Sequence, residues 1–360
     1  MIHIRQRLVG SFATAVAALA ALFACAGASA QVPYKIVTAS ERGTYIQIGR
    51  DLASLVAPDA GIALEVLPSA GSAENVRRLR YEAGVKFALV QSDVYQAYID
   101  LGESGNAEAR ELVRPLRLIL PLYNEEIYFV ARADSPLQYV HDIKDARLNA
   151  GPLGSGTAMT ATTLYRQLFG TSSPEGSTSF LSNEEALVKL TGDKSIDVVA
   201  IVAGQPAKLL ADMKPEARQL VKLLRFDPQH ASSKTALGTY VNAAIRAASY
   251  PNLLSEDLPG LAVQAYLVTY DYGRSDTVRT LRGFARTLCQ NFSMLQAKGH
   301  PKWREVQLAL PELKTGWSYY PPVQKELASC IARAQAPGLA APRQSTKPCS
   351  QQERVLGLCS

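Results

Sequence analysis

Four polar turns carry the residues of this chain whose types and spacing could bind a ligand. Each turn follows an apolar run and precedes a helical pattern: Ser40–Tyr45, Pro68–Ser72, Gln91–Asp93 and Gly151–Thr157. A helix start leaves backbone N–H groups unpaired and carries a partial positive charge, so it attracts an anion. Each start contributes about 0.3–2 kcal/mol toward holding a carboxylate, whereas micromolar affinity needs about 8 kcal/mol. Several turns must therefore converge on one ligand.

The turn Gly151–Thr157 is the most suggestive of the four, because two glycines flank Ser155 and allow a ligand to approach the backbone closely. It lacks the Gly-x4-Gly-Lys-Ser/Thr spacing of a phosphate-binding P-loop and the Gly-x-Ser-x-Gly spacing of a nucleophile elbow. A purely structural role is the alternative for each turn. Ser182 and Glu185 have capping-box spacing without any sign of function.

The residues needed for catalysis or metal binding are sparse. The three histidines beyond the N-terminal segment, His141, His230 and His300, are scattered, and no Cys-x-x-Cys motif occurs. Asp93 has no second carboxylate at a spacing that indicates acid–base chemistry. We expect no enzymatic activity, no metal and no cofactor. An enzyme with Ser155 as nucleophile is the alternative, for which the sequence offers no evident base.

Length and composition favour a two-lobed globular protein. The chain has 360 residues, 47% of them hydrophobic and 19% charged, which is too apolar for a disordered chain and long enough for two lobes. The formal net charge of +6 is spread along the sequence. Without a basic stripe interleaved with aromatic residues, nucleic acid is not expected as a partner.

The first thirty residues have the pattern of an export signal. Arg5 and Arg7 form a basic start, the run Leu8–Ala24 is apolar, and Ala28–Ala30 matches the small-x-small cleavage motif. The apolar run is too short to span a membrane comfortably. We predict cleavage after Ala30 and a periplasmic location, with lipid attachment at Cys25 as the alternative.

Cleavage would leave four cysteines, an even number that indicates disulfides in an oxidising compartment. They are Cys289, Cys330, Cys349 and Cys359, which allow three pairings. We favour Cys289–Cys330, near the ends of a helical stretch, together with Cys349–Cys359, which closes a short loop. Free buried thiols are the alternative.

Alternation of β-rich runs with helical patterns predicts an α/β fold with parallel strands and right-handed crossovers. Expected strands are Tyr34–Ala39, Ala63–Leu67, Lys86–Val90, Leu116–Leu122, Glu126–Ala131, Arg147–Ala150, Ile196–Val202 and 263–270. Expected helices are Tyr45–Val56, Ser72–Glu82, Asp93–Asp100, Ala158–Phe169, Asn183–Leu190 and most of 275–334. Two such sets indicate two α/β lobes around a cleft.

The expected division of the chain has four parts. Residues 1–30 are the signal peptide, residues 31–121 and 226–335 form lobe I, and residues 122–225 form lobe II. The last part, 336–360, is a flexible tail rich in Ala, Pro and Gln that ends in the cysteine loop.

Read in order, six segments resemble a family of transport proteins. They are ASERGTYIQIGRDLA (39–53), PSAGSAENVRRL (68–79), VQSDVYQAY (90–98), ARADSPL (131–137), GPLGSGTAMTATTL (151–164) and VAGQPAKLL (202–210). Together they resemble the TAXI-type (TRAP-associated extracytoplasmic immunogenic protein) solute-binding subunits of TRAP transporters. The resemblance covers most of residues 34–225, and the tail has no counterpart in it.

The resemblance implies a type II periplasmic-binding-protein fold that encloses a small organic anion, an amino acid or a dicarboxylate such as glutamate or 2-oxoglutarate. It implies TRAP membrane subunits as partners and a monomeric receptor. The alternative is a periplasmic sensor that reports to a membrane signalling protein. Carried over by position, the ligand-binding candidates are Thr44, Tyr45, Gly71, Ser72, Gln91, Ser92, Asp93, Ser155, Gly156, Thr157, Gly204 and Gln205.

Overall fold

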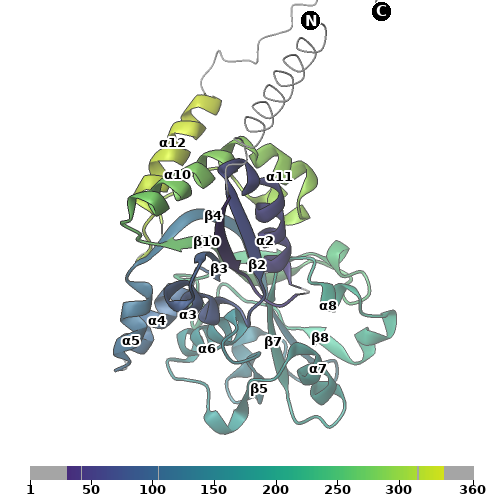
Figure 1. The fold of residues 1–360 in the computed structure, drawn as a ribbon. Helices are drawn as coiled ribbons and strands as arrows, with labels where there is room; N and C mark the ends of the chain where they lie inside the picture. Colours follow the sequence, from purple (N-terminus) through teal and green to yellow (C-terminus); the bar gives the residue numbers. More distant parts are fainter. Residues whose placement is uncertain (1–30, 42, 104, 314–315, 336–360) are drawn as a thin grey trace, which may run out of the picture.

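One ten-stranded sheet organises the protein in a computed structural model, which describes residues 31–41, 43–103, 105–313 and 316–335 (Figure 1). Its main path has the order β2–β1–β3–β10–β4–β7–β5–β6, with β8 paired to β4 and β9 to β10. The strands are β1 (Val32–Val37), β2 (Ile62–Leu67), β3 (Val85–Gln91), β4 (Leu116–Arg132), β5 (Leu148–Asn149), β6 (Thr178–Ser179), β7 (Val198–Ala203), β8 (Val221–Leu223), β9 (Val241–Ile245) and β10 (Leu258–Tyr270).

Helices cover this sheet and connect its parallel strands. They are α2 (Thr44–Leu55), α3 (Ser72–Tyr81), α4 (Val94–Glu103), α5 (Ala107–Val113), α6 (Gly156–Phe169), α7 (Asn183–Thr191), α8 (Lys208–Ala211), α9 (Ser233–Ala236), α10 (Ser275–Gln290), α11 (Phe292–Lys298) and α12 (Pro321–Gln335). Short 3-10 turns are η1 (Pro58–Ala60), η2 (Val140–Ile143), η3 (Glu175–Ser177), η4 (Pro215–Gln219), η5 (Ala247–Ser249) and η6 (Pro301–Glu305). Within the described ranges, no helix has the length and apolar character needed to cross a membrane.

The predicted two-lobe α/β fold is confirmed. In one half of the sheet β1 is parallel to β2 and β3, and in the other half β5 is parallel to β6 and β7. Between the halves, β4 and β10 run antiparallel to each other. Parallel strands need crossover connections, which here are helices, so each half forms its own α/β layer structure.

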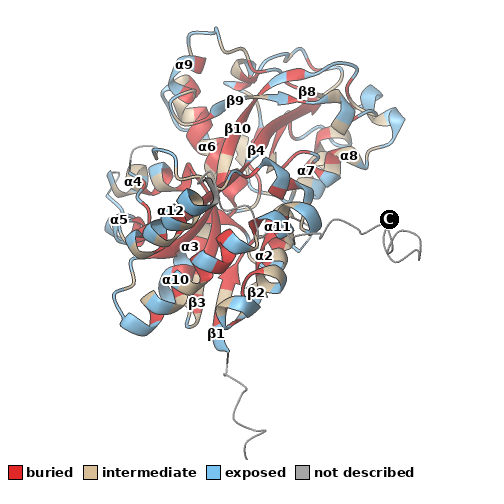
Figure 2. Cartoon of the chain, turned by 90° about the horizontal axis from the view of Figure 1, so that it is seen from above, coloured by how far each residue is buried: buried red, intermediate tan, exposed pale blue. Residues whose placement is uncertain are grey.

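Each lobe has a core on both faces of its part of the sheet. Successive strand residues point to opposite faces, so Ile36 packs with α10 and α12 while its neighbour Val37 packs with α3, α4 and α5. On α10, Leu281, Phe284 and Leu288 recur at helical spacing and form the buried stripe. Figure 2 shows the result, a buried sheet between helices whose outer faces are exposed.

Two strands that we predicted as separate, Leu116–Leu122 and Glu126–Ala131, are one continuous strand, β4. The chain stays extended because β10 pairs with it on both sides of the expected break, at Pro121 and at Asn124. The register shifts between these two points. Pro121 has no N–H to donate, which fits an irregularity in the ladder at this place.

Lobe II extends further along the chain than the predicted boundary at residue 225. Phe226, Tyr240 and Tyr250 pack in its cores, and the grouping continues to Val263 on β10. The reason is that the chain returns from lobe II to lobe I within β10. Val263 packs in a lobe II core, and Ala265 packs in a lobe I core. The junction between the lobes therefore lies at Asn124–Glu126 on β4 and at Gln264 on β10.

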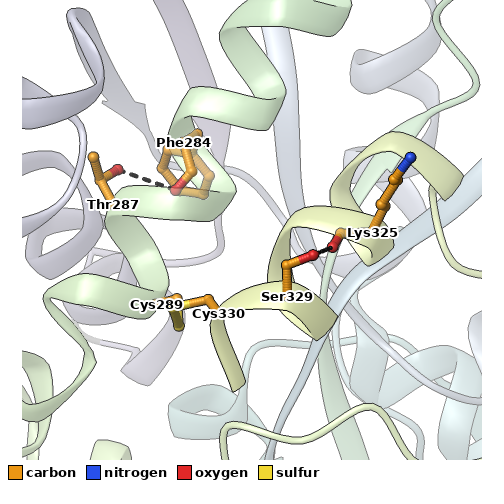
Figure 3. The surroundings of a disulfide bond; sticks show 6 residues. All are labelled: Phe284, Thr287, Cys289, Lys325, Ser329 and Cys330. Atoms are coloured by element: carbon orange, nitrogen blue, oxygen red, sulfur yellow. Dashed lines mark hydrogen bonds between the residues drawn. A yellow bond between two sulfur atoms is a disulfide. The ribbon is translucent and has the colours of Figure 1, made fainter. Parts of the chain in front are cut away.

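The disulfide Cys289–Cys330 is present, as predicted, and joins the end of α10 to α12 (Figure 3). Their Cα atoms are 6.5 Å apart. The second predicted pair, Cys349–Cys359, lies outside the described residues, as do the signal peptide with Cys25 and the tail.

Candidate functional site

The starts of α3 and α6 meet across the junction between the lobes. Gly71, with φ at +129°, faces the amino end of α6 so closely that a Cβ atom on it would lie 3.0 Å from the backbone nitrogen of Gly156. A Cβ atom on Gly156 would lie 2.8 Å from the Ser72 hydroxyl oxygen. The backbone N–H of Glu74 also donates a 3.3 Å hydrogen bond to the carbonyl of Gly154. Two of the predicted turns, one from each lobe, are thus in direct contact.

Gln91 and Asp93 at the end of β3 connect these helices. The Ser72 hydroxyl accepts a 3.1 Å hydrogen bond from the backbone N–H of Gln91. Asp93 accepts hydrogen bonds from two lobe II side chains, Thr160 at 2.6 Å and Tyr240 at 3.0 Å. All of these side chains are buried. Asp93, predicted as a ligand-binding residue, therefore also joins the lobes.

A cluster of ionisable and phenolic side chains lies at the junction, and we call it the hinge cluster: Tyr45, Tyr123, Glu125, Glu126 and Lys302. The Tyr45 hydroxyl donates a 2.7 Å hydrogen bond to Glu125, and the Gln91 side chain donates a 3.4 Å one to the same oxygen. Burial raises the pKa of Glu125 to about 7, although both hydrogen bonds oppose the shift.

Glu126 and Lys302 form the charged part of the hinge cluster. Glu126 accepts a 2.7 Å hydrogen bond from the backbone N–H of Gln205, and its carboxylate lies 3.8 Å from the Lys302 ammonium. Burial raises the pKa of Glu126, and the charge of Lys302 opposes that shift. Lys302 donates to Glu305 at 2.7 Å and to the carbonyl of Asn124 at 3.2 Å.

The first predicted turn, which contains Thr44, and the predicted residue Gly204 also lie beside the hinge cluster. A Cβ atom on Gly204 would lie 2.9 Å from Lys302 Cε and 3.5 Å from both Thr44 Oγ1 and Tyr123 Cε2. Gly204 belongs to lobe II, whereas Thr44 begins α2 in lobe I. The turn after β7 can come this close only because position 204 has no side chain.

Several predicted residues have contacts that hold the protein's own structure. The Gln205 side chain donates to the carbonyl of Ala244 at 3.2 Å and accepts from the N–H of Arg246 at 2.6 Å, which ties it to the β9 region. Ser155 caps α6 by accepting from the N–H of Ala158. Thr157 accepts a 3.3 Å hydrogen bond from the N–H of Val202, and the carbonyl of Ser92 accepts from the indole of Trp317 at 2.9 Å.

Most residues of the hinge cluster were not among the predicted site residues. Glu125 and Glu126 had a detectable signal, because two adjacent acids interrupt the mostly apolar run 116–131. Lys302 had none, since its position beside Glu126 depends on a contact between η6 and β4 that no local pattern indicates.

Comparisons with solved structures give distant similarities. The periplasmic binding protein BugD is 12% identical, with 84% of this chain and 94% of that chain covered and a TM-score of 0.46. PhnD1 from Prochlorococcus marinus, in complex with methylphosphonate, is 11% identical, with 83% and 98% covered and a TM-score of 0.47. A TctC solute-binding protein from Polaromonas is 16% identical, with 85% and 99% covered and a TM-score of 0.40.

The sequence profile of the NMT1-like family matches residues 36–313. This range includes all four polar turns, most of both lobes and the hinge cluster. It extends over well more than half of the chain. The chain therefore belongs to the NMT1-like family.

Proposed function

We propose that this protein is an extracytoplasmic solute-binding protein that captures a small organic anion between its two lobes for TRAP-type transport. The class of solute is an amino acid or a dicarboxylate, such as glutamate or 2-oxoglutarate. Three features support the proposal: the export pattern of residues 1–30, the resemblance of the six segments to TAXI-type subunits, and the family membership. In this role the protein acts in the periplasm as a monomer and delivers its solute to membrane subunits.

The observation that carries the proposal is the meeting of α3 and α6, with Gly71 facing Gly156 across the junction. Both helices point their amino ends toward the same place from opposite lobes, so their partial positive charges add there. An anion bound beside this contact would interact with both lobes at once. Binding then favours the closed arrangement, because only that arrangement brings both helix ends to the anion.

Hydrogen bonds between the lobes help to hold the closed arrangement, and this stabilisation adds to the affinity for a solute that binds the closed form. The contacts through Asp93, Thr160 and Tyr240 join the lobes without involving a solute. A solute that stabilises the closed form therefore adds its own contacts to hydrogen bonds that the protein already makes. Transporter subunits that bind the closed form would receive the solute-loaded protein in preference.

A thermal-shift screen of amino acids and organic acids tests the proposal. A solute that binds only the folded protein raises the melting temperature as ln(1 + [L]/Kd) grows, so the compounds rank by affinity. We expect at least one carboxylate to give a saturable rise, and an analogue with no carboxylate left to lose the contribution of the helix ends. A panel in which no carboxylate raises the melting temperature at millimolar concentration would contradict the proposal.

A further inference from the structure

The hydroxyl group of Tyr123 is the unusual member of the hinge cluster. The residue is 1% exposed, and its oxygen has no hydrogen-bond partner in the described part of the chain. A buried hydroxyl left unpaired costs about 1–3 kcal/mol, and native proteins retain few such groups. Burial, together with the charges of Glu125, Glu305 and Glu126, raises the pKa of Tyr123 well above its usual value. The phenol therefore keeps its proton and can donate it.

The surroundings of Tyr123 belong to the junction where both lobes meet. Its ring packs in a lobe I core, and its edge faces Gly204 of lobe II. Thr44, at the start of the twelve-residue helix α2, faces the same glycine. Two residues predicted to bind the ligand, Thr44 and Gly204, therefore lie beside each other, and Gly204 also lies beside the Tyr123 ring.

The charged residues around Tyr123 determine which solute groups can bind beside its hydroxyl. The Lys302 ammonium lies 5.6 Å from the centre of the Tyr123 ring, but it is already bonded to Glu305 and close to Glu126. Glu126 and Glu305 are thus two acids beside one ammonium, while burial keeps Glu125 largely protonated below about pH 7. A carboxylate brought here from a solute would be repelled by this excess of acid. A carbonyl or hydroxyl oxygen would accept the phenol's hydrogen bond without that repulsion.

We propose that Tyr123 is a specificity-determining residue whose phenol donates a hydrogen bond to an uncharged carbonyl or hydroxyl oxygen of the solute. This inference rests on the proposed function and narrows it. The solute's single carboxylate lies at the starts of α3 and α6, and its uncharged polar end lies at Tyr123. The site then selects monocarboxylates that have a distal carbonyl or hydroxyl group over the corresponding dicarboxylates.

Isothermal titration of the purified protein with two matched pairs tests this inference. The pairs are L-glutamine with L-glutamate and succinamate with succinate, which differ in whether the distal group is an amide or a carboxylate. We expect the wild type to bind at least one amide about tenfold more tightly than its dicarboxylate. Tyr123→Phe should weaken binding of that amide about tenfold and leave its dicarboxylate nearly unchanged, so that the preference is lost.

Tyr270→Phe is the matched control. Tyr270 is also a buried tyrosine, but its hydroxyl donates 2.7 Å to the carbonyl of Leu112 within lobe I. We expect this control to lower the melting temperature and to keep the amide preference. Tyr123→Phe removes an unpaired hydroxyl, so it should not lower the melting temperature of the solute-free protein.

Three results would overturn the inference. In the first, Tyr123→Phe binds every solute as the wild type does; solute binding then stands and only the role of Tyr123 is wrong. In the second, the wild type binds the dicarboxylates more tightly than the amides. Failure of all four compounds to bind also overturns the inference, and a negative screen of the wider panel would then overturn the proposed function as well.

Discussion

The Tyr45 hydroxyl donates a 2.7 Å hydrogen bond to Glu125, which joins the first helix of lobe I to the strand that crosses between the lobes. Neither side chain is more than 5% exposed. A carboxyl group in this position is easier to bury in its protonated form, and its pKa rises to about 7. The junction therefore contains a group that titrates near neutral pH.

Glu125→Gln should change how stability depends on pH. The folded protein holds the Glu125 proton between pH 4.5 and about 7, whereas the unfolded chain releases it. The contribution of Glu125 to the free energy of unfolding therefore falls as pH rises through this window. The full effect is on the order of 3 kcal/mol.

Urea unfolding of wild type and Glu125→Gln at pH 5 and pH 8 measures this effect. We expect the variant to gain stability relative to the wild type between pH 5 and pH 8. Glu65→Gln, at an exposed position, is the control and should change little at either pH. A wild type that loses no more stability than Glu125→Gln over this range would show that Glu125 is ionised throughout.

Gly71→Ala should weaken solute binding by about tenfold or more. A Cβ atom at this position meets the backbone of Gly156 at 3.0 Å, so the helix starts must separate by a few tenths of an ångström. Gly61→Ala is the matched control, because Gly61 also has a positive φ but has nothing within 4 Å of its Cβ position. Gly61→Ala should lose about 1 kcal/mol of stability from backbone strain. Gly71→Ala should lose more, because its φ of 129° and ψ of −153° lie in a region that essentially only glycine occupies, and only Gly71→Ala should lose affinity. Equal affinity in the two variants, measured by titration with the best solute, would argue against closure at Gly71.

Thr160→Val removes one of the hydrogen bonds that join the lobes through Asp93. A buried hydrogen bond is worth about 0.5–1.5 kcal/mol, so the closed arrangement should become less favourable and solute affinity should fall up to about tenfold. Thr162→Val is the control on the same helix, since its hydroxyl bonds to the carbonyl of Ala158 one turn back. Small-angle scattering should show a larger radius of gyration for Thr160→Val than for Thr162→Val. Identical scattering and affinity would mean that Asp93 does not hold the lobes together.

Loss of the Cys289–Cys330 disulfide should lower stability without affecting solute binding. The bond closes a loop with a sequence separation of 41 residues, for which a loss of about 2–4 kcal/mol is expected. The double variant Cys289→Ala/Cys330→Ala should melt at a lower temperature than the wild type, and a reductant should lower the wild type toward the same value. Because α10 and α12 lie on the outer side of lobe I, away from the junction (Figure 1), the affinity for solute should stay the same. A change in affinity would reveal coupling between this helix pair and the cleft.

Much of the fold was predictable because its strands are short apolar runs followed by turn residues. Phe87–Val90 before Gln91 and Val198–Val202 before Gly204 are examples. The lobe boundary was not predictable in the same way. Tyr123–Glu126 is a polar interruption that reads as a loop, but pairing with β10 keeps it extended. That pairing is a long-range contact, which local patterns do not encode.

The candidate site likewise contains some residues that were predictable from the local sequence and others that were not. Helix starts such as Ser72 and Gly156 were predictable, because small and hydroxyl residues before a helical pattern have a local cause. The adjacent acids at Glu125 had a signal in the sequence but no interpretation until their burial was known. Lys302 and Tyr240 reach the junction through tertiary packing alone, and only coordinates could place them there.

The late position of β10 in the sequence has a consequence for how this protein folds. β10 lies between β3 and β4, so the sheet of lobe I stays incomplete until residues 258–270 are available. Contacts between such distant segments form slowly. A chain crossing a membrane through a narrow secretion channel must remain unfolded, and late closure of this sheet would keep the first half of the polypeptide in that state during synthesis.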